Sequence, residues 1–111
     1  MEDTLLSETL ERLLENKKSA SEVKWVGTPT KWFSWEHFTK IADREYDSSY
    51  GTNEVYRELL VVGDDWWLER GEYDGSEWWD FKTLPVKPAT NYEPKNLFLT
   101  RKNYSYPDIE D

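Results

Sequence analysis

The fold of this chain is decided by residues 63–81, which read GDDWWLERGEYDGSEWWDF. Trp-Trp pairs at 66–67 and 78–79 flank an Asp-Gly dipeptide at 74–75. Asp-Gly between two apolar runs predicts a β-hairpin. Side chains alternate across a strand, so one tryptophan of each pair faces the core and the other faces outward.

Two hairpin registers are compatible with this stretch. If residues 74–75 form a two-residue loop, Glu69 faces Asp80 in the other strand. If residues 74–77 form a four-residue loop, Glu69 faces Lys82 instead. The second register replaces a like-charge pair by an opposite pair, a gain of about 0.2–1 kcal/mol, and is therefore preferred.

Both registers place the same side chains on the same faces, because they differ by an even shift; only a bulge would break this assignment. The face with four adjacent apolar groups is predicted to form the core. It carries Trp66, Leu68, Trp79 and Phe81 together with Arg70, Glu72 and Thr83. The other face carries Trp67, Glu69, Gly71, Tyr73, Trp78, Asp80 and Lys82.

The second face is the predicted partner-binding surface, because exposed tryptophans often anchor interfaces. Its candidate residues are Trp67, Glu69, Tyr73, Trp78 and Asp80, ringed by the acids Glu72, Asp74 and Glu77. An alternative is that a helix or the C-terminal segment covers Trp67 and Trp78, which would give a sheet packed on both sides.

The rest of the chain predicts a single α+β domain over residues 1–111, with a twisted antiparallel sheet. Leucines at three- and four-residue spacing predict a helix over 4–16, and an amphipathic stretch after Ser34 predicts a second helix over 35–46. The sheet is expected to contain a three-stranded meander with one or two further short strands. The meander strands are 58–62, 66–73 and 78–83, the short strands are 23–26 and 96–100, and the acidic tail 104–111 is expected to fray.

The composition narrows the classes of partner. The chain has 23 acidic and 14 basic residues, a net charge of −9, so direct binding to nucleic acid or to anionic membranes is not expected. The charge instead favours a protein with a basic surface, such as a nucleic-acid-processing host protein, although it also serves solubility.

No cofactor or metal is predicted. The chain has no cysteine, and its single histidine, His37, lies in no catalytic or metal-binding motif. Glu69 and Asp80 could form an acid/base pair beside aromatic platforms for a sugar, but so small a chain offers little room for a cleft. The sequence has neither a signal peptide nor an apolar run that would span a membrane, so a cytoplasmic location is expected.

The run from Leu60 to Pro85, which includes GDDWWLERGEYDGSEWWDFK, resembles small acidic proteins of Gram-positive bacteria and their prophages. No activity and no functional residues come with this resemblance. It implies a mobile-element context, in which small acidic proteins often bind and block a host protein.

The predicted function is therefore a non-enzymatic, acidic protein-binding module, such as a phage-encoded inhibitor or modulator of a host protein. One alternative is an acidic mimic of nucleic acid that blocks a DNA- or RNA-binding protein. Another is a small carbohydrate-binding or hydrolytic protein.

Overall fold

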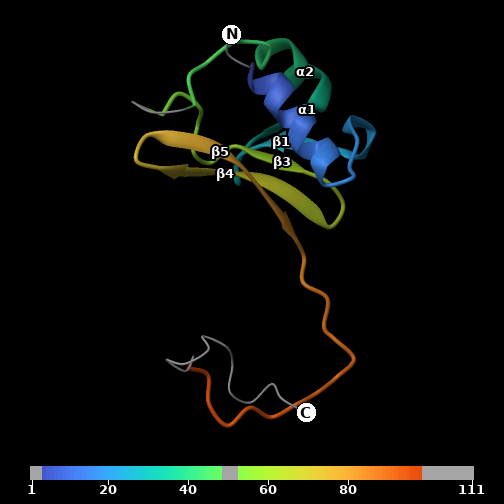
Figure 1. Ribbon diagram of the computed structural model, residues 1–111. Coiled ribbons are helices and arrows are strands. Elements are labelled where there is room, and N and C mark those ends of the chain that lie inside the picture. The colour runs from blue at the N-terminus through green and yellow to red at the C-terminus, as the bar shows by residue number, and fades with distance from the viewer. Residues whose placement is uncertain (1–3, 49–52, 99–111) are drawn as a thin grey trace.

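The computed structural model describes residues 4–48 and 53–98, which form an α+β fold as the sequence predicts (Figure 1). Within these residues, two α-helices and a short 3-10 helix accompany an antiparallel sheet of five strands in the order β2-β1-β3-β4-β5. Both α-helices lie on the same side of the sheet (Figure 1). The elements are α1 (Leu5–Glu15), η1 (Ala20–Glu22), β1 (Trp25–Gly27), β2 (Trp32–Phe33), α2 (Trp35–Ile41), β3 (Leu60–Val62), β4 (Trp66–Tyr73) and β5 (Ser76–Thr83).

Helix α1 has the predicted bounds once its caps are included. The Thr4 side chain accepts a hydrogen bond from the backbone N–H of Ser7, and the Ser7 hydroxyl accepts one from Thr4, which closes a capping box. The helix ends at Asn16, whose N–H bonds back to the carbonyl of Leu13.

Helix α2 begins where it was predicted, with the Ser34 hydroxyl accepting from the His37 N–H, but ends at Ile41 rather than 46. The residues after Ile41 pair with α1 instead of continuing the helix. The carbonyls of Ala42 and Arg44 accept hydrogen bonds of 2.8 and 3.2 Å from the first turn of α1. Tertiary pairing with α1 therefore replaces the last turn that the apolar spacing predicted.

The hairpin has the two-residue loop, so the preferred four-residue register was wrong. Tyr73 pairs with Ser76, and Glu69 lies opposite Asp80. Asp74 and Gly75 both have positive φ, 52° and 88°, the geometry of the tight turns that match strand twist. This turn preference outweighs one like-charge pair on a solvated face.

Several strand bounds differ from the prediction. Strand β5 starts at Ser76 instead of 78, β3 starts at Leu60 instead of 58, and β1 is Trp25–Gly27 instead of 23–26. Strand β2 was not located by the sequence pattern. Residues 96–98 are not in a strand, whereas positions 99–100 and the tail 104–111 lie outside the described residues.

The core lies between the helices and the inner face of the sheet, which is the face that the hairpin pattern predicts. Trp66, Leu68 and Trp79 are buried, and Phe81 packs against them half-buried. Leu13 of α1 and Phe38 of α2 complete the contact between layers; the other buried members are Val26, Ala42, Leu59 and Val61.

Beyond β5, residues 84–98 form an extended arm that runs away from the sheet (Figure 1). Its large apolar side chains are exposed: Leu84, Val86, Tyr92, Leu97 and Phe98. Within residues 4–48 and 53–98, no helix combines the length and the apolar character needed to cross a bilayer.

Candidate functional site: the open face of the sheet

The outer face of the sheet is left uncovered by both helices. Helix α1 packs on the inner face, where the Trp79 indole Nε1–H donates a 2.8 Å hydrogen bond to the Thr9 hydroxyl. The alternative in which α1 covers Trp67 and Trp78 is therefore wrong. Both of these rings are half-buried by their neighbours in the sheet.

Each outer tryptophan of the hairpin is held by a carboxylate two residues further along its own strand. Trp67 Nε1–H donates to Glu69 Oε1 at 2.8 Å, and Trp78 Nε1–H donates to Asp80 Oδ1 at 2.9 Å. Residues two apart share a face of a strand, so the spacing allows this contact. The two hydrogen bonds fix the orientation of both indole rings.

Gly71 gives Trp78 the room to pack closely against β4. A Cβ at position 71 would lie 2.5 Å from Trp78 Nε1 and 2.6 Å from Asp80 Oδ2. The missing side chain therefore lets the indole of Trp78 and the carboxylate of Asp80 lie directly over the β4 backbone.

The face extends further than the hairpin, to two tryptophans that sequence reasoning missed. The register places Trp25, Val62, Trp67 and Lys82 in one row across the sheet. Trp32 of β2 lies opposite Gly27 on the same face and is 69% exposed. The sequence does contain a signal for these two tryptophans. Val26 and Phe33 point toward the core, and side chains alternate along a strand, so the residue before each of them points to the outer face.

A shallow depression of about 420 Å³ lies at the β1–β2 end of the molecule. Trp25, Trp32, Lys24 and Lys31 line it together with the turn at 28–30. The β4–β5 end of the face instead carries Glu69 and Asp80. The outer face is thus aromatic across the sheet, with carboxylates at the hairpin end.

The other residues predicted for the binding surface do not all lie on the outer face. Tyr73 and Asp74 are exposed at the hairpin tip. Glu72 lies on the inner-face side and is exposed, 3.9 Å from Arg57. Glu77 is 4% exposed and faces the helices, so its placement on the rim of the outer face was wrong.

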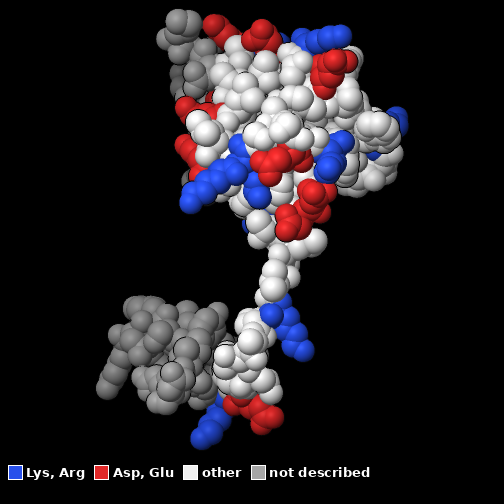
Figure 2. Space-filling model, turned by 90° about the vertical axis from the view of Figure 1, so that its right-hand side faces the viewer, with Lys and Arg blue, Asp and Glu red and all other residues white. Residues whose placement is uncertain are grey.

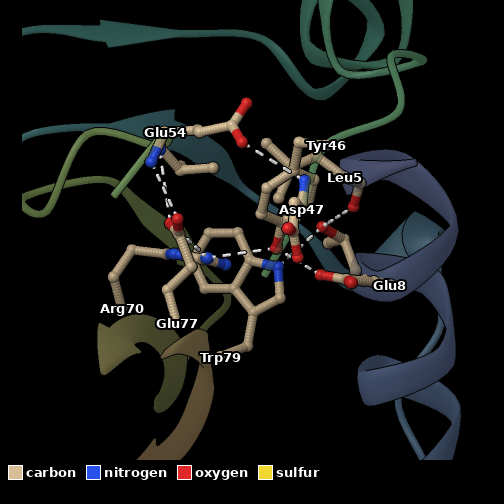
Figure 3. A network of polar contacts seen from close by, with 10 residues as sticks. Leu5, Glu8, Tyr46, Asp47, Glu54, Arg70, Glu77 and Trp79 are labelled. Atoms are coloured by element: carbon tan, nitrogen blue, oxygen red, sulfur yellow. Dashed lines mark hydrogen bonds and ion pairs between the residues drawn. The ribbon is translucent and has the colours of Figure 1, made fainter. Parts of the chain in front are cut away.

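Glu77 belongs instead to a buried polar network on the inner face (Figure 3). Its Oε1 accepts from Arg70 Nη2 at 3.0 Å, and its Oε2 accepts from the Glu54 N–H at 2.8 Å. Arg70 Nη2 also donates to the Tyr46 hydroxyl at 3.2 Å, and that hydroxyl donates a short hydrogen bond to Glu8 of α1.

The network perturbs the titration of Tyr46. Burial, followed by the hydrogen bond to Glu8, raises the pKa of the Tyr46 phenol to about 12. Arg70 itself stacks against the Trp79 ring, with its guanidinium carbon 4.7 Å from the ring centroid. The network therefore joins the hairpin to α1 and to the segment after residue 53.

The carboxylates of the outer face are hydrogen-bond acceptors. Glu69 and Asp80 lie opposite each other, but each accepts from its own tryptophan. No group of three or more metal-ligating His, Cys, Asp or Glu residues occurs within the described part of the chain.

Acidic and basic side chains are interspersed over the middle of the side of the molecule shown in Figure 2. Comparisons with protein-family models, with curated proteins and with solved structures found no match.

Proposed function

We propose that this protein is a small non-enzymatic binding module whose protein partner docks on the outer face of the sheet. The observation that carries the proposal is the set of four tryptophans on that face, which neither α-helix covers: Trp25, Trp32, Trp67 and Trp78. Tryptophan is enriched among the residues that dominate binding energies, because one ring removes a large area from water with few rotatable bonds.

The face is also preorganised. The hydrogen bonds from Trp67 to Glu69 and from Trp78 to Asp80 hold the rings before any partner arrives. Side chains that are already ordered lose less conformational entropy on binding. The same carboxylates, with the net charge of −9, favour a partner with a basic surface.

We further propose that the partner is a host protein in the cytoplasm, which this protein inhibits or modulates. A nucleic-acid-processing protein is one class with the required basic surface. The pure charge mimic receives less support, because Lys82 lies in the tryptophan row and bases are interspersed among acids in Figure 2.

A carbohydrate is the second candidate ligand. The specific observation is that Trp67 and Trp78 flank two carboxylates that face each other, Glu69 and Asp80. Indole faces stack on sugar rings, and carboxylates accept hydrogen bonds from sugar hydroxyls. A glycan array probed with the intact protein distinguishes this candidate, since a protein-binding module leaves every glycan unbound.

The decisive experiment is affinity capture from a host lysate at two salt concentrations with three variants. Trp67→Ala and Trp78→Ala each remove one anchor, and Tyr92→Ala is the matched control because it removes an exposed aromatic ring from the arm. A partner bound by the outer face is retained by the wild type and by Tyr92→Ala, and lost by both tryptophan variants at either salt.

Thermal denaturation of the same variants shows whether they remain folded. Retention of the same partner by folded Trp67→Ala and Trp78→Ala contradicts the proposal. Retention by all variants at low salt only, with loss at high salt, supports the charge mimic, because salt screens charge-led binding but not aromatic burial.

A further inference from the structure

Strand β5 forms one edge of the sheet, and its hydrogen-bonding pattern defines which backbone groups point outward. Tyr73 and Ser76 close a two-residue turn, so even-numbered residues of β5 direct their N–H and C=O groups toward β4. Odd-numbered residues direct theirs away from the sheet. Two observed hydrogen bonds fit this alternation. The Leu84 N–H points toward β4 and donates to the Asp65 carbonyl, whereas the Glu77 N–H points away from β4 and donates to the Ser48 carbonyl.

The free part of this edge is short and has two defined ends. At the first end, the Ser48 carbonyl already occupies the Glu77 N–H at 2.9 Å. At the second end, Pro85 has no N–H to offer. Between them, Trp79, Phe81 and Thr83 direct their backbone N–H and C=O groups away from β4, and within the described residues none of these amides bonds outside the hairpin.

We propose that β5 pairs antiparallel with β5 of a second copy of this chain, about a two-fold axis at Phe81. This register lets all three free residues of each strand bond. Trp79 lies opposite Thr83 of the second copy, Phe81 lies opposite its own equivalent, and each such pair exchanges both backbone hydrogen bonds. The two sheets join edge to edge.

Charge complementarity favours the same register and also favours a second copy of this chain as the partner strand. With Phe81 on the axis, Asp80 lies directly opposite Lys82 of the second copy, and this pair occurs twice. A two-residue slide in one direction sets Asp80 opposite Asp80, and a slide in the other sets Lys82 opposite Lys82. Opposite charges across strands stabilise a sheet, and like charges destabilise it.

An edge lysine ordinarily discourages strand pairing, but in this register the partner strand supplies its counter-ion. Trp78 also comes to lie opposite Leu84 of the second copy, a side chain that is 58% exposed in one copy. The joined sheet carries two copies of the tryptophan face on one side, so a dimer would present twice the area for a partner.

The expected dimer is weak. Only three residues of each strand form backbone hydrogen bonds to the second copy, and a net charge of −9 on each copy opposes association. Sedimentation velocity of the full chain from about 10 to about 500 µM covers the range in which small interfaces dissociate. A rise from monomer to dimer across this range supports the proposal, and a monomer throughout overturns it.

A charge swap tests the register. Asp80→Lys and Lys82→Asp each set like charges opposite one another, so each should raise the dimer dissociation constant at least about tenfold. The double variant restores opposite pairs and should return within about threefold of the wild type. Asp80→Lys also makes each copy less negative, so global repulsion alone predicts tighter association. Tighter association of that variant, or no rescue in the double variant, overturns the register.

A backbone substitution tests the hydrogen bonds themselves. The Thr83 N–H points away from β4, so Thr83→Pro removes an outward donor without removing a hairpin bond. Thr83→Pro should remain folded in thermal denaturation but stay monomeric, whereas Thr83→Ala should dimerise like the wild type. Amide exchange at Trp79, Phe81 and Thr83 should slow as concentration rises, while Glu77 stays protected throughout. A dimer formed equally well by Thr83→Pro contradicts edge pairing.

Discussion

Arg70 and Glu77 form an ion pair whose side chains are only 3% and 2% exposed, with 3.0 Å between Arg70 Nη2 and Glu77 Oε1. They lie on adjacent strands of the hairpin and face the helices. Glu77 also accepts from the N–H groups of Glu54 and Val55, at 2.8 and 3.3 Å. The carboxylate thus anchors the segment after residue 53 to the sheet.

Glu77→Gln should lower the free energy of unfolding by about 3 kcal/mol, because it leaves the Arg70 guanidinium buried without its counter-charge. Urea denaturation measures the change. The control is Glu72→Gln, which removes the exposed acid directly opposite in the register and should cost less than about 0.5 kcal/mol. Equal effects of the two substitutions would show that burial of the pair does not matter.

Trp79→Ala should lower the free energy of unfolding by about 3–5 kcal/mol, because it empties a fully packed site in the core. Trp78→Ala should cost distinctly less, since its ring lies on the uncovered face. Thr9→Val should cost about 1–3 kcal/mol, because the buried Trp79 N–H then has no acceptor. If the two tryptophan variants unfold in the reverse order, the assignment of the faces is wrong.

Tyr46 should make stability depend on pH in the alkaline range. An unfolded chain loses the phenolic proton near pH 10, whereas the raised pKa of about 12 keeps it bound in the fold. The contribution is complete below about pH 10 and is lost as pH rises toward about 12.

The stability advantage of wild type over Tyr46→Phe should therefore shrink by up to about 2 kcal/mol between about pH 9 and pH 12. Denaturant melts at a series of pH values measure it. Tyr73→Phe is the control, because Tyr73 is exposed at the hairpin tip. A wild-type advantage that stays constant across this range would contradict the prediction.

Gly71→Ala should destabilise the fold by about 1–3 kcal/mol, because the new Cβ would overlap the rigid Trp78 ring. The ring and Asp80 must move for the methyl group to fit. In the Trp78→Ala background the same substitution should cost distinctly less, and a double-mutant cycle in urea measures that coupling. Additive effects of the two substitutions would show that the ring does not lie over Gly71.

The sequence alone determined the local structure of this protein, because each such feature depends on residues close together in the chain. Strict alternation in the hairpin predicted which tryptophans face the core, and burial of Trp66 and Trp79 confirms it. The leucine spacing located the first helix, and Ser34 marked the start of the second, which its hydroxyl caps. The predicted four-residue register was wrong, because the turn geometry that Asp74-Gly75 favours outweighs one small cross-strand charge interaction.

Only the tertiary structure decided what lies on each side of the sheet. Leucine spacing gave α1 an apolar stripe but could not say which face of the sheet it covers, and the contact of Thr9 with Trp79 links residues seventy positions apart. Burial of Glu77 depends on Arg70 and on amides more than twenty residues away. Trp25 and Trp32 joined the outer face only through the pairing of β1, β2 and β3. Such contacts form through chain closure over long separations, and no local pattern in the sequence specifies them.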